Sequence, residues 1–189
     1  DNTLLLKMPE LVVLRHEFNL GINAYLGNLE DHPEHPSPPK SLKELITFNE
    51  AHHEQVMPFF AQELFEKAER RGDLSSEIYL ESFKECRRLS RQQGIDAFIQ
   101  KHGLDAFIAP TSGPAWLTDS VNGDPVSIET SFTPSAVAGY PGISVPLGFI
   151  SGLPVGLSFY GGAWSEKMLL RCAQAFENAT KAQIAPEIS

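Results

Sequence analysis

Hydrophobic positions in the first half of the chain recur at helical spacing. A short apolar run and then a helix are predicted over Leu11–Tyr25. Ser41 is followed three residues later by a glutamate, which is typical of a helix start because the serine oxygen accepts from free N–H groups of the first turn. Further helices are predicted over 64–72 and 75–93, and Gly94 interrupts the last of them.

The pattern changes along the rest of the chain. The segment Asp31–Lys40 contains four prolines, which lack the backbone donor that a helix needs, so it is predicted to be a loop. Leu104–Ala109 is a short apolar run that predicts a buried strand, and two β-rich runs, Ile143–Leu147 and Val155–Tyr160, predict neighbouring strands. Ser165–Thr180 has its apolar residues on one face and predicts a helix packed on a sheet.

These elements predict an α/β protein. We expect one domain over residues 1–189, because a chain of 189 residues is the usual size of a single domain. A helical segment is expected over about residues 10–103, and a sheet-contributing segment over about 104–189.

Charge and composition exclude some classes of function. The formal net charge of −9 argues against a nucleic-acid partner. The densest basic cluster, Arg87, Arg88 and Arg91, lies among glutamates and is interpreted as a solvated helix face. No apolar run reaches the roughly 18 residues needed to span a membrane. Cys86 and Cys172 lie in apolar helical stripes, which favours buried thiols and a reducing, cytoplasmic compartment.

Ordered blocks in the second half resemble the amidase-signature family of hydrolases. They comprise a strand ending in Pro110-Thr111, a Gly139-Tyr-Pro block before a strand, a following glycine-rich strand and a closing helix over 166–177. The Pro114-Ala-Trp run is similar to the peptide-amidase-like branch. The resemblance covers essentially the whole chain and corresponds to the later part of a complete family member.

The resemblance implies a mixed β-sheet flanked by helices. It also implies hydrolysis of a carboxamide by a serine nucleophile, a second serine in a cis peptide and a lysine base, without a metal or cofactor. A serine is a poor nucleophile until a neighbouring base takes its proton. The glycine- and serine-rich signature that would carry these groups is missing here, since the one Ser-Ser pair, Ser75-Ser76, is better explained by helix capping. The catalytic residues are therefore expected upstream, and the chain by itself is expected to be inactive.

Other catalytic motifs fail on a decisive residue. His53-Glu54 begins like a zinc-protease helix, but Met57 stands where a second histidine is needed. Ser144 lies in an approximate nucleophile elbow whose last glycine is replaced by Pro146. Ser144 is accordingly predicted to be an ordinary strand residue, and no metal site is predicted.

Candidate substrate contacts follow the first predicted strand. Thr111, Ser112 and Trp116 could line an acyl or leaving-group pocket, because α/β sheets bind ligands beyond their strand ends. The alternative is a loop tucked onto the sheet with Trp116 as its apolar anchor. Glu129 lies ten residues before Gly139, where the tRNA-amidotransferase branch often carries an acid that holds the substrate's amino group; an ordinary surface glutamate is the alternative.

Three functions remain open from the sequence. The first is the C-terminal part of an amidase acting on a small amide or an amidated peptide. The second is a non-catalytic interaction or scaffold domain, and the third is the amidase subunit of a tRNA-dependent amidotransferase. A cut sheet would expose an edge or an apolar face, so self-association of the chain is also expected.

Overall fold

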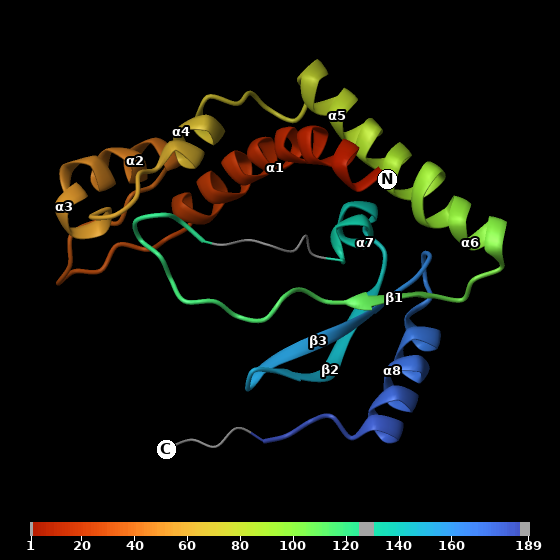
Figure 1. Ribbon diagram of the computed structural model, residues 1–189. Coiled ribbons are helices and arrows are strands. Elements are labelled where there is room, and N and C mark those ends of the chain that lie inside the picture. The colour runs from red at the N-terminus through yellow and green to blue at the C-terminus, as the bar shows by residue number, and fades with distance from the viewer. Residues whose placement is uncertain (1, 125–130, 186–189) are drawn as a thin grey trace. The chain divides into compact units, whose positions relative to one another are not determined.

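The computed structural model describes residues 2–124 and 131–185. The chain divides into two compact units, one formed by Lys7–Lys84 and the other by Asp1–Leu6 together with Glu85–Ser189. Helices and a small sheet make up the described residues, which confirms the α/β class (Figure 1). Within the described ranges, no helix combines the length and the apolar character that crossing a membrane requires.

The Lys7–Lys84 unit is helical. Its helices, two of which extend into the other unit, are α1 (Asn2–Gly27), α2 (Leu42–Ala51), α3 (His53–Val56), α4 (Glu63–Glu69) and α5 (Glu77–Arg87). The first helix was predicted to begin within Leu11–Tyr25, after a short apolar run, which was too late, since α1 already includes residue 2 and contains Pro9. Proline removes only one backbone donor, so a long helix can continue through it where the neighbouring turns keep their hydrogen bonds.

Side chains join the helices of this unit. The side-chain oxygen of Asn23 in α1 accepts from the backbone N–H of Leu42 at 2.7 Å, and Leu42 is completely buried. Gln62, also buried, donates to the carbonyl of Ile46 in α2 at 3.0 Å. These bonds satisfy polar groups that would otherwise be buried at a cost.

The N-terminus of α2 agrees with the sequence prediction. The Ser41 hydroxyl accepts from the backbone N–H of Glu44 at 3.2 Å. The Glu44 carboxylate reaches back and accepts from the N–H of Lys40 at 2.8 Å, one residue before the position expected for a capping box. Both contacts satisfy N–H groups that the helix itself cannot pair.

The other unit contains the sheet. After the end of α5 it holds the π-helical segment η1 (Arg88–Ile95), α6 (Asp96–His102), β1 (Phe107–Pro110), α7 (Thr133–Ala138), β2 (Gly142–Ile150), β3 (Leu153–Tyr160) and α8 (Glu166–Thr180). The sequence analysis did not anticipate α7, a helix of six residues that ends at Gly139 in the left-handed conformation. The final helix was predicted correctly, with Ser165 at its N-cap position.

The sheet has the order β1-β3-β2, and both pairings are antiparallel. Ser144 pairs with Ser158 across β2 and β3, and a bulge between Pro146 and Gly148 shifts the register of the hairpin. The predicted strands are present, although β1 begins three residues later than expected, at Phe107.

One face of the sheet is covered by α8. Val145, Leu157 and Phe159 of the strands form a buried cluster with Leu169 and Ala173 of α8. Since successive strand residues point to opposite faces, Ser144 and Ser158 lie on the face away from α8. The sheet therefore has an apolar face under the helix and a face that carries hydroxyl groups.

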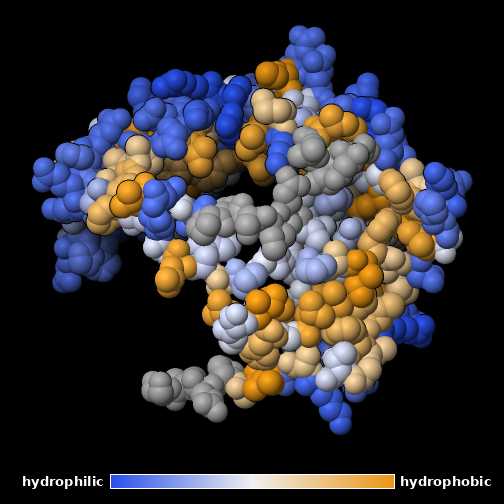
Figure 2. Space-filling model, in the orientation of Figure 1, coloured by the Kyte–Doolittle hydropathy of each residue, from blue (hydrophilic) through white to orange (hydrophobic). Residues whose placement is uncertain are grey.

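Hydrophobic side chains also remain exposed at the far end of the hairpin. Phe149, Ile150 and Leu153 are each at least two-fifths exposed. Figure 2 shows hydrophobic residues gathered over the hairpin and α8 on the visible face. Contiguous apolar surface of this type is what other protein segments commonly cover.

Candidate functional site

Three hydroxyl groups meet at the end of β1. Thr111 follows β1, and its Oγ1 lies 2.8 Å from Ser158 Oγ and 3.3 Å from Ser144 Oγ. Ser144 Oγ and Ser158 Oγ are themselves 2.8 Å apart. A hydroxyl has one donor hydrogen and two acceptor lone pairs, so the three groups can close a ring in which each donates once and accepts once. We call Thr111, Ser144 and Ser158 the hydroxyl ring.

Backbone geometry holds Thr111 in this position. Its N–H donates to the carbonyl of Gly156 in β3 at 2.8 Å, and its own carbonyl accepts from the N–H of Ser131 at 3.3 Å. A Cβ at Gly156 would come within 2.7 Å of Thr111 Oγ1, so glycine is required for this close approach. The ring leaves one lone pair on each oxygen for an external donor.

The remaining predicted substrate contacts are distributed along the following loop. The Ser112 hydroxyl donates to the carbonyl of Gly113 at 3.2 Å. Trp116 is about half exposed, and its indole N–H donates to Asp124 at 3.1 Å, so it is held within its own loop. The structure thus joins Thr111 to Ser144, which was predicted to be an ordinary strand residue, and to Ser158, which the sequence analysis did not single out. Glu129 lies outside the described residues.

The Ser75-Ser76 pair lies in the helical unit, just before α5. The Ser75 hydroxyl and the Ser75 backbone N–H both donate to Asp73, at 2.5 and 2.8 Å, and these bonds hold the pKa of Asp73 below its usual range. The Ser76 hydroxyl lies 3.3 Å from Nε2 of His16, a buried histidine whose Nδ1 is 2.7 Å from the carbonyl of Val12. These contacts tie the start of α5 to α1.

A second polar group surrounds the turn between α7 and β2. The Nε–H of Arg91 donates to the carbonyl of Ala138 at 2.7 Å, and its guanidinium lies over the Tyr140 ring at 5.1 Å. The Tyr140 hydroxyl donates to Asp96 at 3.0 Å. Arg91 therefore departs from the predicted solvated helix face, since it binds the turn and is only partly exposed.

The turn between Arg91 and Asp96 explains how both side chains reach this site. The N–H of Asp96 donates to the carbonyl of Arg91, five residues earlier, which is the π-helical spacing. The φ and ψ of Gly94 between them are not helical, so this turn, which we call the π turn, is a kink between two helices. In an unbroken α-helix five residues make about 1.4 turns, so the two side chains would point in different directions. The kink brings them to one side.

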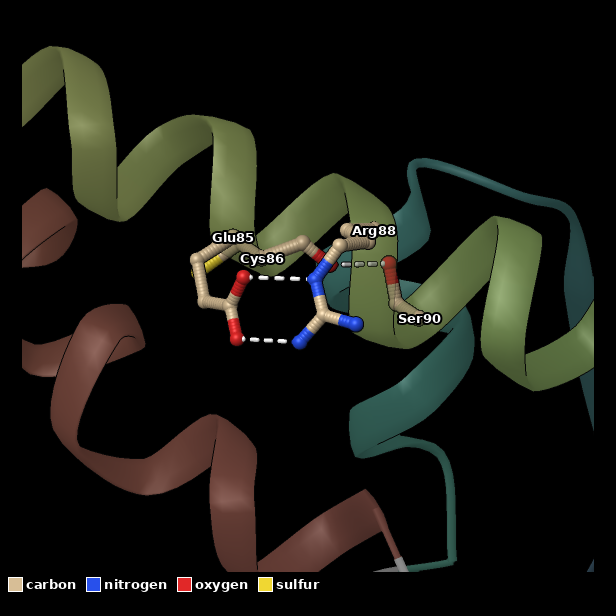
Figure 3. A network of polar contacts seen from close by, with 4 residues as sticks. All are labelled: Glu85, Cys86, Arg88 and Ser90. Carbon is tan, nitrogen blue, oxygen red and sulfur yellow. Dashed lines mark hydrogen bonds and ion pairs between the residues drawn. The ribbon is translucent and has the colours of Figure 1, made fainter.

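Neighbouring side chains stabilise the approach to this π turn. Arg88 forms two hydrogen bonds with the Glu85 carboxylate, at 2.7 and 2.6 Å, and the Ser90 hydroxyl donates to the carbonyl of Cys86 at 2.7 Å (Figure 3). The paired bonds have the fork geometry that arginine forms with carboxylates. A serine hydroxyl that donates to the carbonyl four residues earlier is often found where a helix bends.

The environment of Tyr140 changes its ionisation. Burial raises the pKa of Tyr140, and the hydrogen bond to Asp96 and the charge of that carboxylate raise it further, while the positive charge of Arg91 opposes them.

Among the described residues there is no group of three or more His, Cys, Asp or Glu side chains that could hold a metal ion.

The sheet, the ordered sequence blocks and the closing helix define an α/β domain, and comparison with known proteins gives the family. The Amidase family model matches residues 20–170. The chain belongs to the amidase family, as the sequence resemblance predicted.

Solved structures and curated relatives agree with this assignment. A peptide amidase in complex with the competitive inhibitor chymostatin is 40% identical, with a TM-score of 0.88 over 99% of this chain and 37% of that chain. Native peptide amidase from Stenotrophomonas maltophilia is 39% identical, with a TM-score of 0.85 over 98% of this chain and 36% of that one. A probable amidase of Arabidopsis thaliana is 35% identical over 90% of this chain and 29% of its own length. The chain thus spans about a third of these relatives.

Proposed function

We propose that residues 1–189 form the C-terminal portion of one amidase domain, which hydrolyses a carboxamide to a carboxylate and ammonia. The main support is the similarity to peptide amidase, which extends over 99% of this chain but only 37% of that protein. The Ser-cisSer-Lys residues are assigned to a preceding part of the protein. In this proposal the 189 residues are inactive alone, because a nucleophile and its base must lie in contact.

The residues proposed to line the substrate pocket are Thr111, Ser112, Trp116 and Glu129. Thr111 supports this role because the hydroxyl ring can accept from an amide N–H and, after reorienting, donate to a carbonyl. Trp116 supplies an exposed aromatic surface beside it in sequence. An amidated peptide is the proposed substrate class, since the most similar solved structures reported above are peptide amidases.

A second candidate is the A subunit of a glutamyl-tRNA amidotransferase. The subunit of Marinobacter nauticus is 43% identical, but over 54% of this chain and 21% of its own length. This narrower match makes it the weaker proposal. A non-catalytic scaffold domain is the third possibility, and the same assay separates all three.

Ammonia release tests these proposals directly. The 189-residue chain and the whole gene product that carries it are each incubated with amidated dipeptides, simple carboxamides and glutamine. We expect release by the gene product from amidated peptides, and none by the chain. Release from glutamine alone would favour the amidotransferase subunit, and no release by the gene product would favour a scaffold. Hydrolysis by the chain itself would contradict the proposed division of residues.

The proposed pocket is tested by variants of the gene product. Thr111→Val removes a hydroxyl with little change of volume, and Trp116→Ala removes the aromatic surface. Each is expected to raise KM or lower kcat for amidated peptides by about tenfold, the effect of about 1.4 kcal/mol. Leu117→Ala, at a side chain that is 91% exposed, is the matched control. If all three variants behave alike, the pocket assignment is wrong.

We also propose that the chain alone self-associates through the exposed hairpin residues Phe149, Ile150 and Leu153. Light scattering at high concentration, with Phe149→Ser as the comparison, tests this. A reducing, cytoplasmic compartment is proposed because neither cysteine is in a disulfide within the described residues.

A further inference from the structure

A pocket of about 390 Å³ lies beside the Arg91 turn. Its lining residues are Arg91, Gly139, Tyr140, Pro141, Ala163, Trp164 and Glu166. All of them belong to the unit that contains the sheet. None of the lining residues is among Thr111, Ser112, Trp116 and Glu129. It is therefore separate from the substrate pocket proposed above.

Arg91 presents a fixed and largely unused donor group in this pocket. A guanidinium carries five N–H groups, and the Nε–H is bound to the carbonyl of Ala138. Its two terminal amino groups make no hydrogen bond or ion pair with the described residues. The contact with the Tyr140 ring and the π turn at Gly94 hold the guanidinium plane in place. Such a preorganised fork matches a carboxylate.

Gly139 lies against this fork. Its φ of 66° is left-handed, which favours glycine, and a Cβ there would make an ordinary contact of 3.5 Å with a terminal nitrogen of Arg91. Trp164, also on the pocket wall, is 90% exposed and has a φ of 64°. A positive φ is rare for a bulky residue and costs conformational energy. The backbone on either side of Trp164 therefore holds the indole at the pocket in a strained conformation.

The charges of the pocket limit the ligand. Arg91 supplies one positive charge, and Glu166 supplies one negative charge on the wall. Asp96 is occupied by the Tyr140 hydroxyl. A ligand with several negative charges would be repelled by Glu166, whereas a single carboxylate can pair with Arg91 while an aromatic body contacts Trp164 and Tyr140.

We propose that this pocket binds a monocarboxylate with an aromatic body. Arg91 holds the carboxylate through its terminal N–H groups, and the rings of Trp164 and Tyr140 contact the remainder of the ligand. The proposal does not depend on amide hydrolysis, because none of these residues is assigned to the substrate pocket.

Calorimetric titration of the gene product tests the proposal. Phenylacetate is the probe, and 2-phenylethanol is its uncharged counterpart. We expect saturable binding of phenylacetate that weakens as salt rises, and binding of 2-phenylethanol at least tenfold weaker. Equal binding of the two compounds, or no saturable binding of phenylacetate, would overturn the proposal.

Variants locate the binding at this pocket. Glu166→Gln removes the opposing charge without touching the Arg91 turn, and it should tighten phenylacetate binding about two- to fivefold. Arg91→Lys keeps the charge but loses the fork, and it should weaken binding about tenfold or more. If Arg91→Lys fails to fold, Trp164→Ala replaces it, with weaker binding expected. Binding that is unchanged in Glu166→Gln and Trp164→Ala would place the ligand elsewhere and refute the assignment.

Discussion

Gly94→Ala is the substitution that most directly tests the role of the π turn. The φ and ψ of Gly94, −115° and −116°, lie outside the regions open to residues with a side chain. A Cβ at this position would lie 2.5 Å from the carbonyl oxygen of Leu89. That oxygen belongs to the backbone, so it cannot move aside as a flexible side chain would.

The expected loss of stability follows from these two effects. Strained φ and ψ angles cost about 1–3 kcal/mol, and overpacking costs a similar amount when it cannot be relieved. The lower entropy of an unfolded chain with alanine returns about 0.4–1 kcal/mol. We expect a net loss of about 3 kcal/mol, near the middle of the range that these figures give, which for a protein of this size corresponds to a fall in Tm of about 6–12 °C.

Thermal unfolding followed by circular dichroism measures this change. Gly21→Ala is the matched control, because Gly21 is inside α1 and a Cβ there meets nothing within 4 Å. Alanine at that position should raise stability by about 0.5–1 kcal/mol. If the helix relaxed to α geometry, Asp96 would move away from Tyr140, and the pKa of Tyr140 would fall. A Gly94→Ala protein with unchanged Tm and unchanged Tyr140 titration would refute the role of the π turn.

Three further substitutions test separate parts of the structure. Ser41→Ala removes the cap of α2 and should cost about 1 kcal/mol in urea unfolding, whereas the exposed Thr47→Ala should change little. Ser158→Ala deletes the buried member of the hydroxyl ring and should cost about 1–2 kcal/mol by the same measurement; full retention of stability would argue against a closed ring. Burial raises the pKa of Glu10, so its contribution to stability is present below its ordinary value of 4.5 and is lost as pH rises through the folded pKa. Glu10→Gln should therefore raise Tm at pH 7 and leave it nearly unchanged at pH 4; an equal effect at both would contradict the assignment.

The sequence was sufficient to predict elements with strong periodic patterns. The helix from Glu166, the β2–β3 hairpin and the capped start of α2 all appear where the pattern placed them. In each case a long apolar stripe or a capping residue makes the local preference agree with the packing. The secondary structure of the first ten residues was harder to predict, because Pro9 and a run of leucines obscure the helical pattern of α1.

The polar groups were predicted less well, for a physical reason. Thr111 was selected as a loop residue, but its partners Ser144 and Ser158 come from strands 33 and 47 positions away. Arg91 lies in a charged stretch whose composition indicates a solvated face, and only the π turn directs it to Ala138. Pairings of this kind depend on strand register and helix geometry, which residue types alone do not determine.

The hydroxyl ring has a consequence for how the sheet tolerates its surroundings. Since each hydroxyl hydrogen can find an acceptor inside the ring, no donor has to lose its partner when water is removed, and no ion has to be dehydrated. The same surface can therefore be solvated or covered by another polypeptide segment with little change in its own bonding. Such a sheet face needs no change of protonation or of internal hydrogen bonds when its surroundings change.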